Sequence, residues 1–233
     1  MTQSPFQLRI SRRASRLRID VSARRGVIVV VPEGTPREIV HRFVHAKRGW
    51  IRRARDRVAA EAGHLARPDE SVPARLDLRA LDAEYPVERV DGDQLRVDCD
   101  GARVLVAGAD DAAAVRAALA RWLKRVGRRQ LVPRLAELAG EHGLHYERAA
   151  VRGQRTRWGS CSGRGTISLN YKLLFLPPAL VDHVMLHELA HTRHLDHSHE
   201  FWRLLGALDP QWRSHHTALT RAMRWLPAWV EMD

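Results

Sequence analysis

Apolar and polar residues alternate in the first part of the chain as they do in β-strands. Leu17, Ile19 and Val21 fall on one face of a short segment, and a β-branched run follows at residues 27–31. An Arg-Arg-Gly turn lies between these two segments, so the pattern predicts a β-hairpin. Later apolar segments, separated by Asp-Gly pairs, predict further short strands at residues 85–90, 95–99 and 104–106.

Helical spacing of apolar residues follows these strand regions. One helix is expected over residues 36–62, with Thr35 as its N-cap. A second helical pattern covers residues 111–142, and Pro133 predicts that it consists of two segments. A third helix is expected to begin at the Pro177-Pro178 pair, and its mainly apolar composition predicts that it is buried.

This third helix contains the pentapeptide His-Glu-Leu-Ala-His, residues 187–191, which points to a chemical function. Residues four apart share a helix face, so His187 and His191 can direct their imidazoles at one metal ion. Glu188 lies beside His187, where its carboxylate can accept a proton from a metal-activated water. Two histidines on a helix can also be merely packed or solvated. A buried glutamate between them is costly without a compensating ion, which favours a metal site.

A zinc peptidase needs a third protein ligand, and several residues near the motif are candidates. His194 continues the helical stripe, but seven helical residues span about 10.5 Å, too far for one ion to bind both it and His187. His197 follows a predicted break in the helix, ten residues after His187, and this is a spacing used by known zinc peptidases. His197 is therefore the first choice. The other candidates are His199, Glu200 and Glu231.

Several residues that precede the His-Glu-Leu-Ala-His motif are candidates for roles in substrate binding or in the structure of the site. Arg157 suits either an oxyanion contact or a structural ion pair, and Asn170 suits either substrate backbone or a neighbouring loop. Cys161 is interpreted as a packed residue, because three histidines leave no ligand position for it. An extended peptide substrate is expected to pair with an edge strand formed by residues 166–170.

Three segments in order resemble the YgjP-like metallopeptidases, which are relatives of the SprT-like zincins. The segments are RTRWGSCS (155–162), ISLNYKLLFLP (167–177) and VMLHELAHTRHLDHSHEFW (184–202), and the N-terminal SRRASRLRIDV, VIVVVP and KRGWI resemble the same family. The resemblance implies an α+β fold, a minimal zincin-like metallopeptidase domain with an N-terminal β-rich extension. It also implies His187, His191 and His197 as ligands. His194 stands where metzincins have glycine, which argues against a metzincin proper.

Strand and helix patterns together divide the chain into a β-rich N-terminal region with one long helix, residues 1–108, and a metallopeptidase domain, residues 109–233. Charge is also unevenly distributed. The net charge is +12, and residues 1–57 contain 15 basic and four acidic residues, whereas the remainder is nearly neutral. Such a basic region can bind nucleic acid or another polyanion, although a solvated arginine-rich surface is the commoner explanation.

Composition bears on the compartment as well. The sequence lacks both an apolar run of the ~20 residues that span a bilayer and an N-terminal secretory signal, so no membrane partner is expected. Only two cysteines occur, Cys99 and Cys161. These features predict a reduced, cytoplasmic protein.

We therefore expect a zinc-dependent metallopeptidase that binds one Zn²⁺ per chain and hydrolyses peptide bonds in a peptide or protein substrate. Glu188 is the expected general base, acting on a metal-activated water. The alternatives are a basic nucleic-acid-associated binding module with a structural zinc, or a protease that acts on nucleic-acid-bound proteins. Three histidine ligands leave an open coordination position, which favours an enzyme because structural zinc sites are usually closed by four protein ligands.

Overall fold

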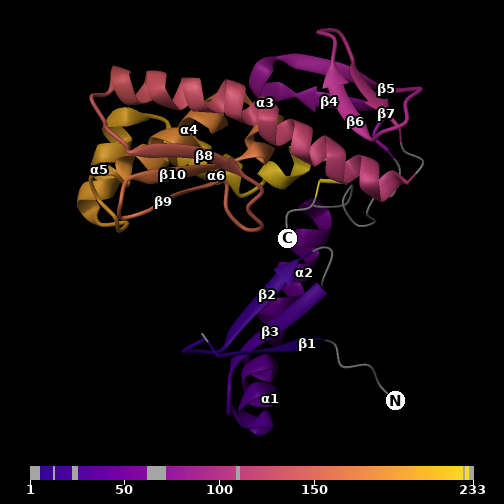
Figure 1. The fold of residues 1–233 in the computed structure, drawn as a ribbon. Helices are drawn as coiled ribbons and strands as arrows, with labels where there is room; N and C mark the ends of the chain where they lie inside the picture. The colour runs from indigo at the N-terminus through magenta and orange to yellow at the C-terminus, as the bar shows by residue number, and fades with distance from the viewer. Residues whose placement is uncertain are drawn as a thin grey trace. The chain divides into compact units, whose positions relative to one another are not determined.

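The computed structural model describes residues 6–12, 14–22, 26–61, 72–108, 111–227 and 229–230. Contacts divide the chain into two compact units, residues 1–68 and 69–233 (Figure 1). The first unit is built on a small sheet, and the second combines two sheets with the longest helix of the described residues. The α+β class expected from the sequence is confirmed.

The N-terminal unit contains a mixed sheet in which the strands follow the order β1-β3-β2. Its strands are β1 (Gln7–Ser11), β2 (Arg18–Ser22) and β3 (Gly26–Pro32). Strand β3 pairs antiparallel with β2 and parallel with β1, so the predicted hairpin is confirmed and gains a third strand. A small apolar cluster of Val29, Val31 and Val40 forms the core of this unit.

The single helix expected over residues 36–62 is two helices, α1 (Arg37–Ala46) and α2 (Arg48–Glu61), which meet at Lys47. Lys47 has φ −98° and ψ 3°, outside the helical range, but its N–H still donates to Phe43 O and its carbonyl accepts from Ile51 N. The backbone hydrogen bonds on both sides of Lys47 are therefore kept. The spacing of apolar residues in the sequence does not reveal the break. The predicted N-cap is also wrong, because Thr35 Oγ1 donates to Pro32 O instead of capping the helix.

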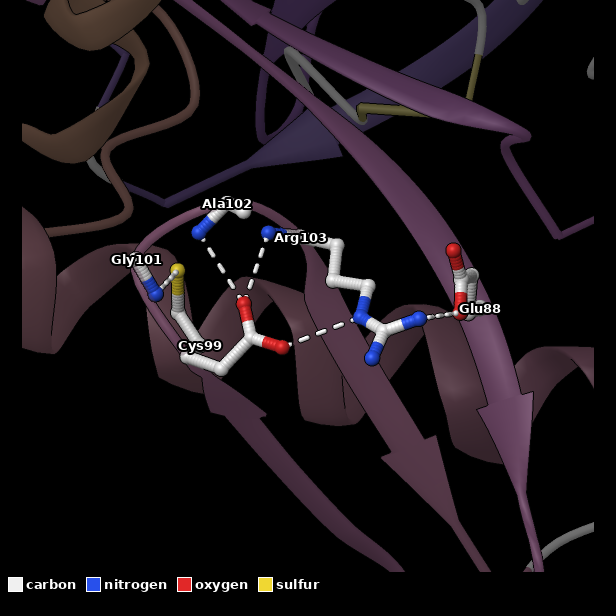
Figure 2. A network of polar contacts seen from close by, with 6 residues as sticks. Glu88, Cys99, Gly101, Ala102 and Arg103 are labelled. Atoms are coloured by element: carbon white, nitrogen blue, oxygen red, sulfur yellow. Dashed lines mark hydrogen bonds and ion pairs between the residues drawn. The ribbon is translucent and has the colours of Figure 1, made fainter.

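The second unit opens with a four-stranded sheet in the order β4-β5-β7-β6. Its strands are β4 (Arg75–Leu78), β5 (Ala83–Val90), β6 (Arg96–Cys99) and β7 (Val104–Ala107), so the three strands predicted here are confirmed. Figure 2 shows how the β6–β7 turn is closed. Asp100 accepts hydrogen bonds from the backbone N–H groups of Ala102 and Arg103 and from Arg103 Nε, and Arg103 also pairs with Glu88 on β5 at 2.7 Å. The hydrogen bonds from Ala102 and Arg103 lower the pKa of Asp100 to about 2.

Helix α3 (Ala112–Glu141) is continuous, so the predicted division into two segments is wrong. Pro133 removes one backbone donor, but Leu131 and Leu135 on either side of it are buried, and packing keeps the helix intact. Asp111 caps the start by accepting from the N–H groups of Ala113 and Ala114. Gly143, with φ +60°, follows the end of the helix and adopts the left-handed conformation that favours glycine.

The remaining elements form a second sheet and a group of short helices around α4, and one strand and two helices of this group lie against α3 (Figure 1). The strands are β8 (Arg148–Arg152), β9 (Gly159–Cys161) and β10 (Thr166–Asn170), in the order β8-β10-β9. The helices are η3 (Tyr171–Phe175), α4 (Pro178–Ala190), α5 (His199–Leu208), α6 (Trp212–Leu219) and η4 (Ala222–Trp225). None of the helices in the described residues is long and apolar enough to cross a membrane.

The two sheets of the second unit share one core with α3. Buried residues of the first sheet belong to the same apolar cluster as Leu119 and Leu123 of α3; they are Leu76, Leu78, Val97, Val104 and Val106. The division by contacts, at residues 68 and 69, therefore differs from the domain limits expected from the sequence, 1–108 and 109–233.

The shared core predicts the effect of a cavity in β4. Leu78 is fully buried, so Leu78→Ala should lower the free energy of unfolding by about 2–5 kcal/mol. Denaturant unfolding followed by circular dichroism should then show one earlier transition for the whole second unit. Leu195→Ala is the control, because Leu195 is exposed and its loss should change little. Separate transitions for the sheet and for α3 would contradict a shared core.

Candidate metal centre

Helix α4 begins at the Pro177-Pro178 pair, as the sequence predicted, and is buried along most of its length. His187 lies in its last turn and His191 immediately follows the helix as its C-cap. Four-residue spacing puts both rings on one side, with centroids 4.9 Å apart. The helix therefore presents two imidazoles together at its C-terminal end.

His197 joins these two rings from the turn between α4 and α5. Ser198 caps α5 by accepting from Phe201 N, and Asp196 accepts from Ser198 N, so short-range hydrogen bonds fold the turn back. His197 Nε2 lies 3.2 Å from His187 Nε2, and one ring nitrogen from each of the three histidines lies within 4.8 Å of the others. The structure thus brings together the three histidines selected from the sequence.

Hydrogen bonding sets the tautomer of one of these rings, and burial favours the neutral, metal-binding form of another. His191 Nδ1 lies 2.9 Å from His194 O, and donation to this carbonyl leaves Nε2 as the free nitrogen. Burial, together with repulsion from His191 and His197, lowers the pKa of His187 to about 3. Neutral imidazole is the form that binds metal ions.

The other candidates for the third ligand do not join the group. His194 contributes its backbone carbonyl to His191, while His199 and Glu200 are exposed in the first turn of α5. None of these three belongs to the metal-capable groups found among the described residues. Glu231 lies outside the described residues.

Glu188 is a buried carboxylate beside the histidines. Its side chain lies against Gly159 of β9, where an added Cβ would come within 2.7 Å of Glu188 Cγ and Oε1. Burial raises the pKa of Glu188 to about 7, although the positive charge of Arg157 and the Cys161 backbone N–H act in the opposite direction. Oε2 has no hydrogen-bond partner in the described residues. A glycine on β9 therefore leaves space for the Glu188 carboxylate, and this role of Gly159 was missed in the sequence.

These residues fit a bound metal ion. Two unprotonated ring nitrogens 3.2 Å apart repel each other unless a proton or a cation lies between them, and that separation suits two ligands of one ion. The buried, unpartnered Glu188 oxygen is also costly unless a polar group approaches it. Three neutral imidazoles suit zinc among the common metals.

The structure assigns contacts to Asn170 and to the strand that the sequence proposed for substrate binding. Asn170 donates from Nδ2 to the carbonyls of Gln154 and Arg157 and accepts from Lys172 N, so it holds the loop before β9. Strand β10, residues 166–170, is paired with β8 on one side and β9 on the other. It cannot serve as the edge strand expected for substrate, since neither of its edges is free.

A second polar cluster adjoins the centre. Asp209 Oδ2 lies 2.6 Å from His183 Nδ1 and 2.9 Å from His215 Nδ1. Although such a group is capable of binding a metal, these separations are those of hydrogen bonds, so the two rings donate to one carboxylate. Burial alone would raise the pKa of Asp209, but the hydrogen bonds from His215 and His183 outweigh it and lower the pKa. The cluster ties α4 to the start of α6.

Comparison with known proteins agrees with this centre. The family model described as "YgjP-like, metallopeptidase domain" matches residues 15–222. The chain belongs to the YgjP-like metallopeptidase family. The resemblance noted in the sequence is thereby confirmed, and a metal-dependent peptidase is the activity that this family indicates.

A solved structure, the metallopeptidase zymogen of Pyrococcus abyssi abylysin, is 22% identical to this YgjP-like chain. The alignment covers 39% of this chain and 91% of that one, with a TM-score of 0.36. No curated protein gives a significant match.

The geometry predicts which histidine substitutions remove metal. His197→Ala should strongly lower the zinc content of the purified protein, because one of three converging nitrogens is lost. His194→Ala should leave zinc content unchanged, since His194 acts on His191 through a backbone carbonyl that alanine retains. Elemental analysis of both variants provides the test, and equal zinc loss in the two would reassign the third ligand.

Proposed function

We propose that this chain is a zinc peptidase in which one ion is held by His187, His191 and His197, with Glu188 as the general base. The observation that carries the proposal is the unpartnered Oε2 of buried Glu188 beside three converging imidazoles. Bound zinc would supply Lewis acidity, making a water molecule easier to deprotonate near neutral pH and polarising the scissile carbonyl.

Glu188 has two tasks in this mechanism. Its Oε2 takes a proton from the attacking water, and the protonated carboxyl then returns that proton to the leaving amine. Gly159 supports both tasks, because any larger residue at this position would displace the carboxylate. Burial of Glu188 keeps bulk water away from the proton being transferred.

Strand β9 is the proposed binding edge for an extended peptide. Its pairing with β10 runs through Ser160 and is flanked by the bonds Ser162 N to Thr166 O and Asn170 N to Trp158 O. Hydrogen-bonding residues alternate along an antiparallel strand, so backbone groups of Gly159 and Cys161 face away from β10. Gly159 lies against the Glu188 side chain and the Cys161 backbone N–H acts on its carboxylate, so a substrate paired with the remaining groups of this edge would bring its scissile bond to the general base.

Polyanion binding by the N-terminal unit is a second candidate function. Arg9, Arg16 and Arg18 line a hollow of about 330 Å³ together with Ser11 and Ser15. Guanidinium and hydroxyl groups are common phosphate-binding donors, so the hollow suits a nucleic-acid backbone. Arg18 also pairs with Asp20 at 2.9 Å, which reduces the charge that it offers. Nucleic-acid binding therefore stays a hypothesis.

The general-base proposal predicts a separation of activity from metal binding. Glu188→Gln keeps the shape of the side chain but removes its basicity, so peptide hydrolysis should fall by at least ~10²-fold while zinc content stays the same. The measurement is cleavage of a fluorogenic peptide library by the zinc-loaded protein.

Gly159→Ala provides a second route to the same result, because the new methyl group would push the Glu188 carboxylate aside. Gly140→Ala is the matched control, since a Cβ there meets nothing within 4 Å. Full activity in Glu188→Gln would contradict the role of Glu188. Full activity in Gly159→Ala alone would contradict only the role given to the glycine.

The polyanion hypothesis predicts a salt-dependent affinity. If the hollow binds phosphates, changing Arg9, Arg16 and Arg18 to alanine should weaken binding of random-sequence DNA or RNA and flatten its salt dependence, because fewer counterions are released. Fluorescence anisotropy over a salt series measures both quantities, with heparin as a competing polyanion. Three exposed arginines of the second unit serve as the control set, Arg121, Arg128 and Arg221. If both sets of substitutions weaken binding equally, the affinity depends on the net charge of the protein and not on the hollow.

A further inference from the structure

His197 is the most exposed of the three proposed ligands, and it lies between helices rather than within one. His191 is oriented by the carbonyl of His194, but the only hydrogen-bond partner of the His197 ring within the described residues is His187 Nε2. A ligand on a turn holds a metal tightly only when surrounding groups fix its ring. The side chains that pack against His197 must therefore fix the orientation of its ring.

Aromatic rings from the first turn of α5 cover the two ligands that lie outside the body of α4. Phe201 stacks on His191, with centroids 4.5 Å apart and an interplanar angle of 30°. Trp202, the next residue, stacks on His197 at 5.4 Å and 29°. Each ligand ring thus has one aromatic face against it.

The stack on His197 continues away from the metal centre. Trp212, the first residue of α6, lies on Trp202 with centroids 4.7 Å apart and an angle of 23°. The Arg213 guanidinium carbon is 4.5 Å from the centroid of Trp212. Both indoles are only partly buried, so filling the apolar core does not fully explain the arrangement.

Two contacts fix the position of Trp212. A Cβ on Gly206 of α5 would lie 3.2 Å from Trp212 Nε1 and 3.5 Å from Cδ1, so the indole rests directly on the helix backbone. Trp212 N donates to Asp209 O, and the Asp209 carboxylate holds His183 of α4. The outer end of the stack is therefore anchored to the helix that carries His187.

We infer that Trp202 and Trp212 are positioning residues for the third metal ligand: their stack fixes the ring plane of His197, and Gly206 allows the stack to close. This inference rests on the proposed function, because it takes His197 as a ligand. Partners that orient a metal-bound histidine typically contribute 10–100-fold to metal affinity. We expect a loss of about tenfold when the stack is disturbed.

The test compares zinc affinity of full-length variants by competition with a chromophoric chelator. Gly206→Ala and Trp212→Leu should each bind zinc about tenfold more weakly and release it faster than the wild type. Alanine is a better helix former than glycine, so Gly206→Ala should not prevent α5 from forming. Gly140→Ala, the matched glycine substitution in α3, should bind zinc as the wild type does.

Two further measurements separate positioning from general stability. The metal-free forms of wild type and Gly206→Ala should melt at similar temperatures, and Trp202→Phe should keep most of the affinity that Trp202→Leu loses, because a phenyl ring can still stack. Affinity losses that follow equal destabilisation of the metal-free protein, or equal losses in the phenylalanine and leucine variants, would overturn the inference.

The remaining outcomes distinguish the inference from the proposed function. Wild-type affinity in both Gly206→Ala and Trp212→Leu would overturn the role of the stack and leave the zinc site intact. A wild-type chain that binds no zinc, or one that keeps its affinity after His197→Ala, would overturn the proposed ligand set and the inference with it.

Discussion

Burial of a carboxylate among histidines, in a helix that is mainly apolar, is the constraint on which the rest of the second unit depends. Glu188 is 6% exposed and one of its oxygens has no hydrogen-bond partner among the residues that the structure describes, so a polar group is left unsatisfied there next to three imidazoles. Such an arrangement is costly in a protein without a ligand. Its cost is offset when an ion and a substrate occupy the centre, which is why the arrangement supports a peptidase function.

Packing around α4 makes that arrangement possible. Helix α3 and the second sheet cover α4, and Gly159 on β9 leaves space for the carboxylate. On the other side, Asp209 joins α4 to α6 through His183 and His215, while the first turn of α5 places aromatic rings on two of the histidines. Hydrogen bonds and stacked rings therefore restrict His197, which the backbone alone leaves on a turn.

The N-terminal unit has a separate, smaller core and most of the net positive charge. Its arginines gather partly around a hollow and partly in ion pairs such as Arg18 with Asp20. Charge of this kind acts over distance and depends on salt, whereas the metal centre depends on contacts of a few ångströms. The two units can therefore be tested independently.

Local signals in the sequence determined the hairpin, strands β5, β6 and β7, and the grouping of His187, His191 and His197, because each depends on residues close together in the chain. Helix breaks were not determined locally. Lys47 interrupts a helix that the apolar pattern runs through, and Pro133 lies inside a continuous helix that the sequence had predicted to be divided there. Strand order is likewise a tertiary property. The sequence suggested β10 as the edge strand, whereas in the folded chain β10 is central and β9 lies at the edge. Contacts of Gly159 with Glu188, and of Trp212 with Trp202, join residues that are far apart or on different helices, so only the folded chain could place them.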